Sequence, residues 1–148
     1  MPIDTPTDDA RAIDLIREVR YGRISVSMRA LPFVTVARHI VVDGQVLLRM
    51  HRGYGYHRAC EGCVVAYGAD NIDSLGSAEG STGDVWSVQF VGTARLFVPC
   101  AAELARFGPT PQTADGDPYD PVYLRIEPQF CTVHRLDGVP ARLSAHAV

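Results

Sequence analysis

The sequence predicts a mainly β protein, a small barrel of six or seven strands with an N-terminal helix and short connecting helices. Two observations lead to this fold class. Apolar and polar residues alternate in several stretches beyond residue 22, as in Arg23-Ile24-Ser25-Val26, which is typical of strands with one buried face. Long helical periodicity is confined to the N-terminal part. Because closure removes exposed sheet edges, many strands with few helices favour a barrel.

The N-terminal residues 1–7 are expected to form a loose tail, and residues 8–20 a helix whose apolar side chains share one face. Asp43-Gly44 is a tight-turn signal and predicts a hairpin. Gly92 is expected to mark a bend within a strand, and Pro128 to separate the last two strands. Strands are expected over residues 23–28, 33–42, 45–50, 63–70, 85–98, 122–127 and 130–136.

The segments between the strands carry the candidate binding residues. Residues 51–59 hold two glycines, two histidines and two arginines, and we expect a binding loop that opens a short helix. The other connections are a Gly- and Ser-rich loop over 74–83, a short helix over 101–107, a proline-rich loop over 108–121 and a C-terminal tail over 137–148. All 148 residues are expected to form a single domain.

The composition excludes several classes of function. The formal net charge is −3, so nucleic acid is not an expected partner. No apolar run is long enough to span a membrane, and the start lacks a secretory signal, so we expect a cytoplasmic protein. All 14 residues in the Lys and Arg class are arginine. This excludes a Schiff-base lysine and the lysine of a Walker-type phosphate loop.

The four cysteines are expected to be reduced and free of metal. Cys60 and Cys63 form a C-x-x-C pair, and with His51 and His57 upstream they leave a zinc site or a redox disulfide open. The sequence holds no second C-x-x-C pair, so we favour thiols without a metal.

Several short motifs occur along the chain in a recognisable order. They are Gly22-Arg23-Ile24, Asp43-Gly44, Arg49-Met50, Gly55-Tyr56-His57-Arg58, Val65-Ala66-Tyr67-Gly68-Ala69-Asp70, Trp86-Ser87-Val88-Gln89-Phe90-Val91-Gly92-Thr93-Ala94 and Arg125-Ile126-Glu127-Pro128. In this order the chain resembles the pyridoxamine 5'-phosphate oxidase-like family of FMN-binding split barrels over roughly residues 10–136. The resemblance implies a split β-barrel, bound FMN, a homodimer and an oxidoreductase acting on an unidentified small molecule.

The resemblance also assigns residues to the cofactor. Arg49 would anchor the flavin phosphate from a partly exposed strand end, while Met50 stands where the family has threonine. His57 and Arg58 stand where the family has its phosphate-binding lysine. The other assigned positions are Thr35 and Val36, whose backbone amides would face the flavin ring, and Trp86, near the cofactor or the dimer seam. Tyr54 and Tyr56 are expected either to pack against the ring system or to serve ordinary packing at the barrel rim.

Three alternatives stay open within the same fold. A deazaflavin coenzyme or haem would replace FMN, with His39, His51, His57 or His134 as haem ligands. In the second alternative the protein is a non-catalytic flavin- or haem-binding protein. In the third it is a cofactor-free interaction subunit. No Ser-His-Asp arrangement or paired carboxylates support hydrolysis, and no catalytic residue is identified.

Overall fold

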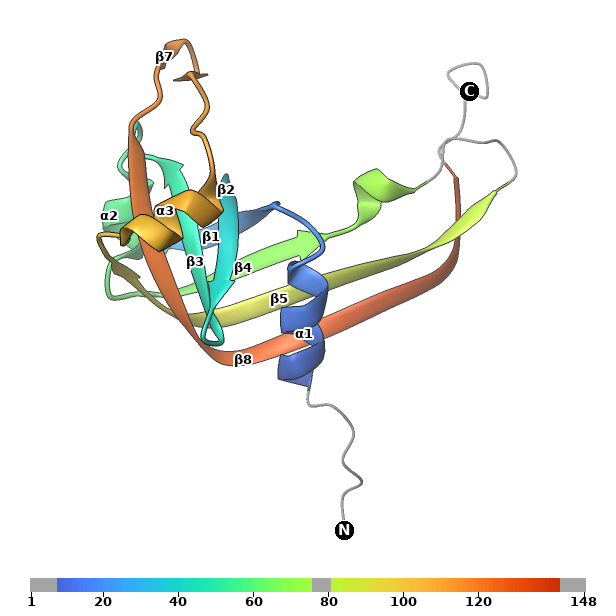
Figure 1. The fold of residues 1–148 in the computed structure, drawn as a ribbon. Coiled ribbons are helices and arrows are strands. Elements are labelled where there is room, and N and C mark those ends of the chain that lie inside the picture. Colours follow the sequence, from blue (N-terminus) through green and yellow to red (C-terminus); the bar gives the residue numbers. More distant parts are fainter. Residues whose placement is uncertain (1–7, 76–80, 142–148) are drawn as a thin grey trace.

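The computed structural model describes residues 8–75 and 81–141. Its strands close into a barrel in the order β1-β2-β3-β8-β5-β4 (Figure 1). Their bounds are β1 Tyr21–Met28, β2 Leu31–Val42, β3 Gln45–His51, β4 Val64–Asp70, β5 Thr82–Leu96 and β8 Pro121–Pro140. The barrel class predicted from the sequence is therefore confirmed.

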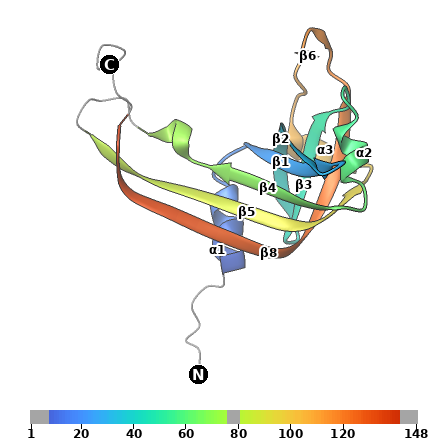
Figure 2. The same ribbon diagram turned by 180° about the vertical axis from the view of Figure 1, so that it is seen from behind.

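Helix α1 (Asp8–Ile16) covers the side of the barrel formed by β5 and β8 (Figure 2). Ala12 and Ile16 are fully buried in the barrel core. The helix is shorter than the predicted 8–20, because the chain tightens into a turn in which the Val19 amide donates to the Ile16 carbonyl. The imidazole of His39 donates to the same carbonyl over 2.8 Å, and the helix ends there. The predicted tail over 1–7 lies outside the described residues.

The hairpin of β2 and β3 is confirmed. Asp43 and Gly44 have φ angles of 50° and 76°, the left-handed values that a two-residue hairpin turn requires. A matching turn at Arg29 and Ala30, with φ angles of 52° and 65°, joins β1 to β2.

The longest pair of strands corrects two predictions. The predicted break at Pro128 is wrong, because β8 runs without interruption and pairs with β5 on both sides of it. The pairing register shifts beside Gly92, opposite the proline, which agrees with the irregularity expected at Gly92. A Cβ at Gly92 would lie 2.1 Å from the Glu127 carbonyl oxygen. The predicted tail over 137–148 is wrong for residues 137–140, which belong to β8, and residues 142–148 lie outside the described part.

The connecting segments carry short elements: α2 Tyr56–Cys60, η1 Ile72–Ser74, α3 Ala101–Phe107, β6 Thr113–Ala114 and β7 Asp117–Pro118. Helix α3 is confirmed over the predicted residues. The predicted loop 108–121 instead contains the β6–β7 hairpin, which projects beyond the barrel (Figure 1). Of the predicted loop 74–83, residues 76–80 lie outside the described part, and 82–83 already belong to β5.

Two apolar clusters stabilise the molecule. The larger fills the barrel. The smaller lies outside the barrel wall, where Phe107 of α3 packs on Ile40 of β2 and Leu47 of β3. It holds α3 against the outer wall, and this placement shapes the site.

No helix in the described residues is long and apolar enough to cross a membrane.

Candidate functional site

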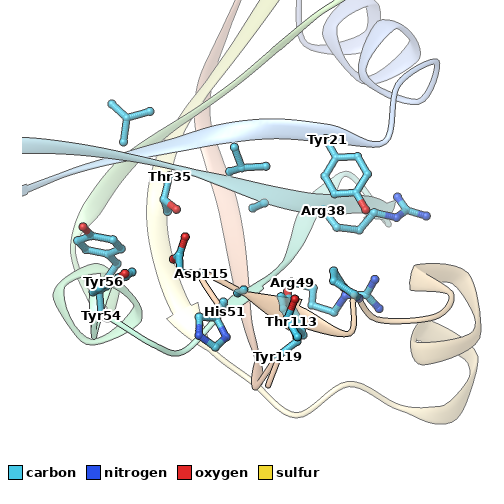
Figure 3. Close-up of a pocket in the computed structure, with 15 residues that line it drawn as sticks. Tyr21, Thr35, Arg38, Arg49, His51, Tyr54, Tyr56, Thr113, Asp115 and Tyr119 are labelled. Atoms are coloured by element: carbon cyan, nitrogen blue, oxygen red, sulfur yellow. The ribbon is translucent and has the colours of Figure 1, made fainter. Parts of the chain in front are cut away.

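A cavity of about 390 Å³, which we call the main cavity, lies between the first half of β2, the loop after β3 and the β6–β7 hairpin (Figure 3). The residues that line it on β1, β2 and β3 are Tyr21, Val34, Thr35, Val36, Ala37, Arg38, Arg49 and His51. The residues that line it from the two connecting segments are Tyr54, Tyr56, Pro111, Thr113, Ala114, Asp115 and Tyr119.

The β2 wall of this cavity is an unpaired strand edge. Strand β3 pairs with β2 only from Arg38 onward, whereas β1 pairs with β2 from Leu31 to Arg38. Along β2 the backbone N–H and C=O groups of successive residues point alternately toward β1 and toward β3. The registers of the two-residue turns at both ends of β2 place the groups of Val34 and Val36 on the β3 side. In the described residues no strand pairs with that edge. It therefore offers backbone donors and acceptors to a ligand.

The side chains around this edge are apolar and aromatic. Val34 is 59% exposed and Val36 is 55% exposed, although both belong to a barrel strand. The rings of Tyr54 and Tyr56 lie 5.9 Å apart, and Phe33 lies 5.6 Å from Tyr56. Such a surface fits the face of a flat, conjugated ring system.

The β6–β7 hairpin faces the tyrosines across the cavity. Its turn residues Asp115 and Gly116 have φ angles of 52° and 86°. The Asp115 carboxylate raises the pKa of the Tyr54 phenol by its charge and by a hydrogen bond. This contact joins the hairpin to the loop after β3.

Arg49 is buried, which contradicts the predicted partly exposed strand end. Only 2% of its surface is exposed, and its guanidinium lies 5.5 Å from the centre of the Phe107 ring. It donates to the carbonyls of Gly108 over 2.8 Å and of Pro109 over 3.0 Å. Cationic side chains stabilise helix C-termini in this way. Arg49 thus fastens the segment after α3, and only its buried Nε has no partner in the described residues.

A second cavity, of about 570 Å³, adjoins the first and shares His51 and Tyr54 with it. Arg52, His57 and Arg58 line it. His57 is 3% exposed, and its Nδ1 is buried without a partner among the residues that the structure describes. Burial lowers the pKa of His57, and Arg52 and Arg58 lower it further. This cavity therefore combines cationic groups with an unsatisfied polar atom.

Asp120 also lines the second cavity. Its carboxylate lies 3.3 Å from Nε of Arg52, and its backbone amide donates to Nδ1 of His51 over 3.1 Å. These contacts tie the loop after β3 to the start of β8.

The predicted cofactor residues divide into three groups. Thr35, Val36, Arg49 and Tyr56 line the main cavity, and His57 and Arg58 line the second. Met50 and Trp86 line neither of these two cavities: they are 2% and 8% exposed in the barrel core. Met50 points inward because it follows Arg49 on a strand, where successive side chains alternate.

Sequence reasoning missed Tyr21, Asp115 and Tyr119 as lining residues, whereas it expected Tyr54, with Tyr56, to pack against a ring system. Tyr21 joins the site because β1 pairs it with Arg38, and strand register was not readable from the sequence. The Asp115-Gly116 pair carries the same turn signal as Asp43-Gly44 and would have indicated a hairpin.

The cysteines lie apart from these cavities. Cys60 is buried, and burial raises the pKa of its thiol to about 11, whereas Cys63 is exposed. Within residues 8–75 and 81–141 no group of three or more His, Cys, Asp or Glu side chains is arranged to hold a metal ion.

The family model described as pyridoxamine 5'-phosphate oxidase matches residues 8–135. The chain belongs to the pyridoxamine 5'-phosphate oxidase family. The split-barrel fold agrees with this membership. No curated protein matches the chain in sequence.

Solved structures with the same fold include three whose sequences have diverged far from this chain. The FAD binding protein of Mycobacterium smegmatis is 23% identical, with a TM-score of 0.64 over 85% of this chain and 94% of that one. A putative pyridoxamine 5'-phosphate oxidase of Corynebacterium glutamicum is 22% identical, with a TM-score of 0.60 over 93% and 98%. The FAD and haem binding protein of Mycobacterium smegmatis is 14% identical, with a TM-score of 0.61 over 90% and 73%.

Proposed function

We propose that this member of the pyridoxamine 5'-phosphate oxidase family binds a flavin nucleotide, FMN, in the main cavity and acts as a flavin-dependent oxidoreductase. The observation that carries the proposal is the unpaired β2 edge at Val34 and Val36, which opens into a cavity lined by tyrosines. A flavin ring has polar atoms along one edge and apolar faces, so both properties of the cavity suit it. Similar folds described as FAD binding proteins support the same class of cofactor.

The flavin phosphate is assigned to the second cavity. The guanidinium of Arg49 already donates to carbonyls at the end of α3, so it has little left for a phosphate. Arg52, Arg58 and the unsatisfied His57 line the second cavity, which adjoins the first at His51 and Tyr54. Arginine forks bind phosphate oxygens well, and this chain has no lysine to replace them.

The bound flavin would supply the electron transfer. The residues of this chain would bind the ring on the β2 edge, orient it with Tyr54 and Tyr56, and limit access of water through the β6–β7 hairpin. No catalytic side chain is assigned. A non-catalytic flavin-binding protein of the same fold is the alternative, and turnover with added electron donors distinguishes the two.

A second copy of the chain is proposed to cover the exposed residues of the main cavity. Val34, Val36 and Tyr54 are more than half exposed, which is a large apolar surface for a free monomer. A homodimer would cover it. The free cysteines suit a reducing compartment, so we propose the cytoplasm as the location.

The experiment is a titration of the protein with FMN, FAD and riboflavin, preceded by an absorbance spectrum of the purified material. The informative variant is Val36→Pro, which removes the N–H that faces the cavity and leaves the pairing with β1 intact. Loss of one neutral hydrogen bond of about 0.5–1.5 kcal/mol weakens flavin binding by about two- to tenfold.

The matched control is Thr35→Pro, which removes an N–H on the β1 side and should lower the melting temperature. Equal flavin affinity in wild type and Val36→Pro would show that the β2 edge does not bind the flavin. A spectrum with a haem band, or failure to bind any flavin, would overturn the flavin assignment itself.

A further inference from the structure

A separate pocket of about 250 Å³ lies on the other side of β2 residue Arg38, toward α1 and α3. Its walls come from the segment that follows α1, from residues 38–41 of β2, and from the last turn of α3. It shares only Arg38 with the main cavity. The proposed flavin function does not use it.

Arginines dominate this pocket, which we call the arginine pocket. Arg17, Arg20, Arg38 and Arg106 line it, and no Asp or Glu does so among the described residues. Arg17 approaches Asp14 at 3.9 Å, but both side chains are more than half exposed. Such a pair contributes little. In residues 8–75 and 81–141 the other three arginines form no ion pair.

The walls of the arginine pocket are fixed by hydrogen bonds. The guanidinium of Arg38 donates to the carbonyls of Arg106 over 3.1 Å and of His39, and reaches that of Arg20 at 3.5 Å. The buried His39 donates its backbone N–H to the Arg20 carbonyl over 3.0 Å. These bonds join the segment after α1, β2 and α3 and hold the Arg38 guanidinium in place, whereas Arg17, Arg20 and Arg106 are exposed residues around it.

The positive charge exceeds what the local structure neutralises. The C-terminal ends of α1 and α3 each supply about half a negative charge, and Asp14 supplies one more. Four guanidinium groups therefore face roughly two negative charges. Burial lowers the pKa of Arg38, and the charges of the neighbouring Arg20 and Arg49 lower it further.

We propose that the arginine pocket binds an oxyanion, a phosphate or carboxylate group carried by a small molecule, at a site distinct from the flavin cavity. Guanidinium groups match the planar and tetrahedral oxygen arrangements of these anions with two parallel hydrogen bonds. The volume lies below the range of pockets that enclose whole drug-sized ligands, so it suits an anionic end group or a free anion.

The test is calorimetric titration of the full chain with inorganic phosphate and, separately, with acetate, at constant ionic strength with chloride as the background anion. Wild type should bind at least one of them saturably. Arg106→Gln removes one charge and should weaken that binding about tenfold or more. The relative affinities for phosphate and acetate tell which of the two groups the pocket prefers.

The matched control is Arg135→Gln, an exposed arginine on β8 outside the pocket, which should leave anion binding unchanged. Arg20→Gln provides a second variant if Arg106→Gln fails to fold in thermal melts. Absence of saturable binding by either anion, or equal weakening in Arg106→Gln and Arg135→Gln, would overturn the proposal. FMN affinity is measured in the same proteins and should be unchanged by Arg106→Gln, so the two proposals fail independently.

Discussion

At the scale of single residues, the buried cation Arg49 holds the segment after α3 in place by hydrogen bonds. Its guanidinium meets carbonyl oxygens of Phe107, Gly108 and Pro109 and has no carboxylate partner in the described residues. A buried charge is tolerated when it is hydrogen-bonded, and of the Arg49 nitrogens only Nε has no partner in the described residues. The wall of the main cavity therefore depends on this side chain even if no ligand touches it.

Arg49→Ala should lower the free energy of unfolding by about 2–4 kcal/mol, because buried carbonyls lose their donors. Chemical denaturation measures this loss, and limited proteolysis should show faster cleavage within residues 107–121. Arg135→Ala, at an exposed position, is the control and should change neither quantity. Unchanged stability in Arg49→Ala would contradict this structural role and favour the phosphate-anchoring role that the resemblance implied.

His39 gives the molecule a defined pH response. Its Nε2 donates to the Ile16 carbonyl and its Nδ1 lies 2.5 Å from the Tyr67 hydroxyl, so the neutral ring satisfies both contacts. Burial lowers the pKa of His39 in the folded state. The unfolded chain, with a pKa of about 6.5, then binds a proton that the folded chain does not.

Stability should therefore be full above about pH 6.5 and decline as the pH falls below it. Urea denaturation between about pH 7.5 and 5.5 measures this decline. His39→Gln should be less stable at the upper end but should show a smaller decline. An identical decline in both proteins would mean that other groups cause it.

At the scale of elements, the β6–β7 hairpin is separate from the barrel and contacts the cavity through its turn. Gly116 and Gly44 both occupy left-handed turns with no atom near an added Cβ. A left-handed conformation costs a non-glycine residue about 1 kcal/mol or more. A glycine-to-alanine substitution therefore strains the hairpin over the cavity at Gly116 and the hairpin within the barrel at Gly44.

Gly116→Ala should weaken flavin binding severalfold and leave barrel stability nearly unchanged, because only the hairpin over the cavity is strained. Gly44→Ala should lower the free energy of unfolding by about 1 kcal/mol, since its turn joins two barrel strands. Flavin titration and denaturation of both variants measure the contrast. A stability loss of equal size in Gly116→Ala would show that the hairpin supports the barrel itself.

At the scale of the whole molecule, the exposed apolar residues predict association. Val34, Val36, Val64, Phe130 and Leu136 are each about half exposed or more. Surfaces of this kind on a small barrel indicate an interface, and two-fold dimers are the commonest assembly.

Light scattering at micromolar concentration should therefore give a mass close to twice the chain mass of 16.1 kDa. Val36→Glu places a charge on the proposed interface and should shift the mass toward the monomer while weakening flavin binding. A single species with the mass of one chain for wild type, with and without FMN, would contradict the dimer.

The sequence by itself determined the local elements and the family. Alternation of apolar residues predicted the barrel strands, the Asp43-Gly44 pair predicted the hairpin, and residues 101–107 predicted α3. These features depend on side chains close together in the chain, so a linear reading finds them. Motif order also placed Val36 and Tyr56 among the predicted site residues, and both line the main cavity. The Thr35 amide, which was predicted to face the cofactor, is directed toward β1 instead.

The tertiary structure alone decided which side chains meet. Arg49 is buried because α3, which comes much later in the chain, packs on the outside of β2 and β3. Strand β8 passes through Pro128 because β5 offers Gly92 opposite it, where no Cβ stands in the way. The arginine pocket forms because α1, β2 and α3 converge. Each of these depends on how segments far apart in the chain pack against one another, which local sequence patterns do not record.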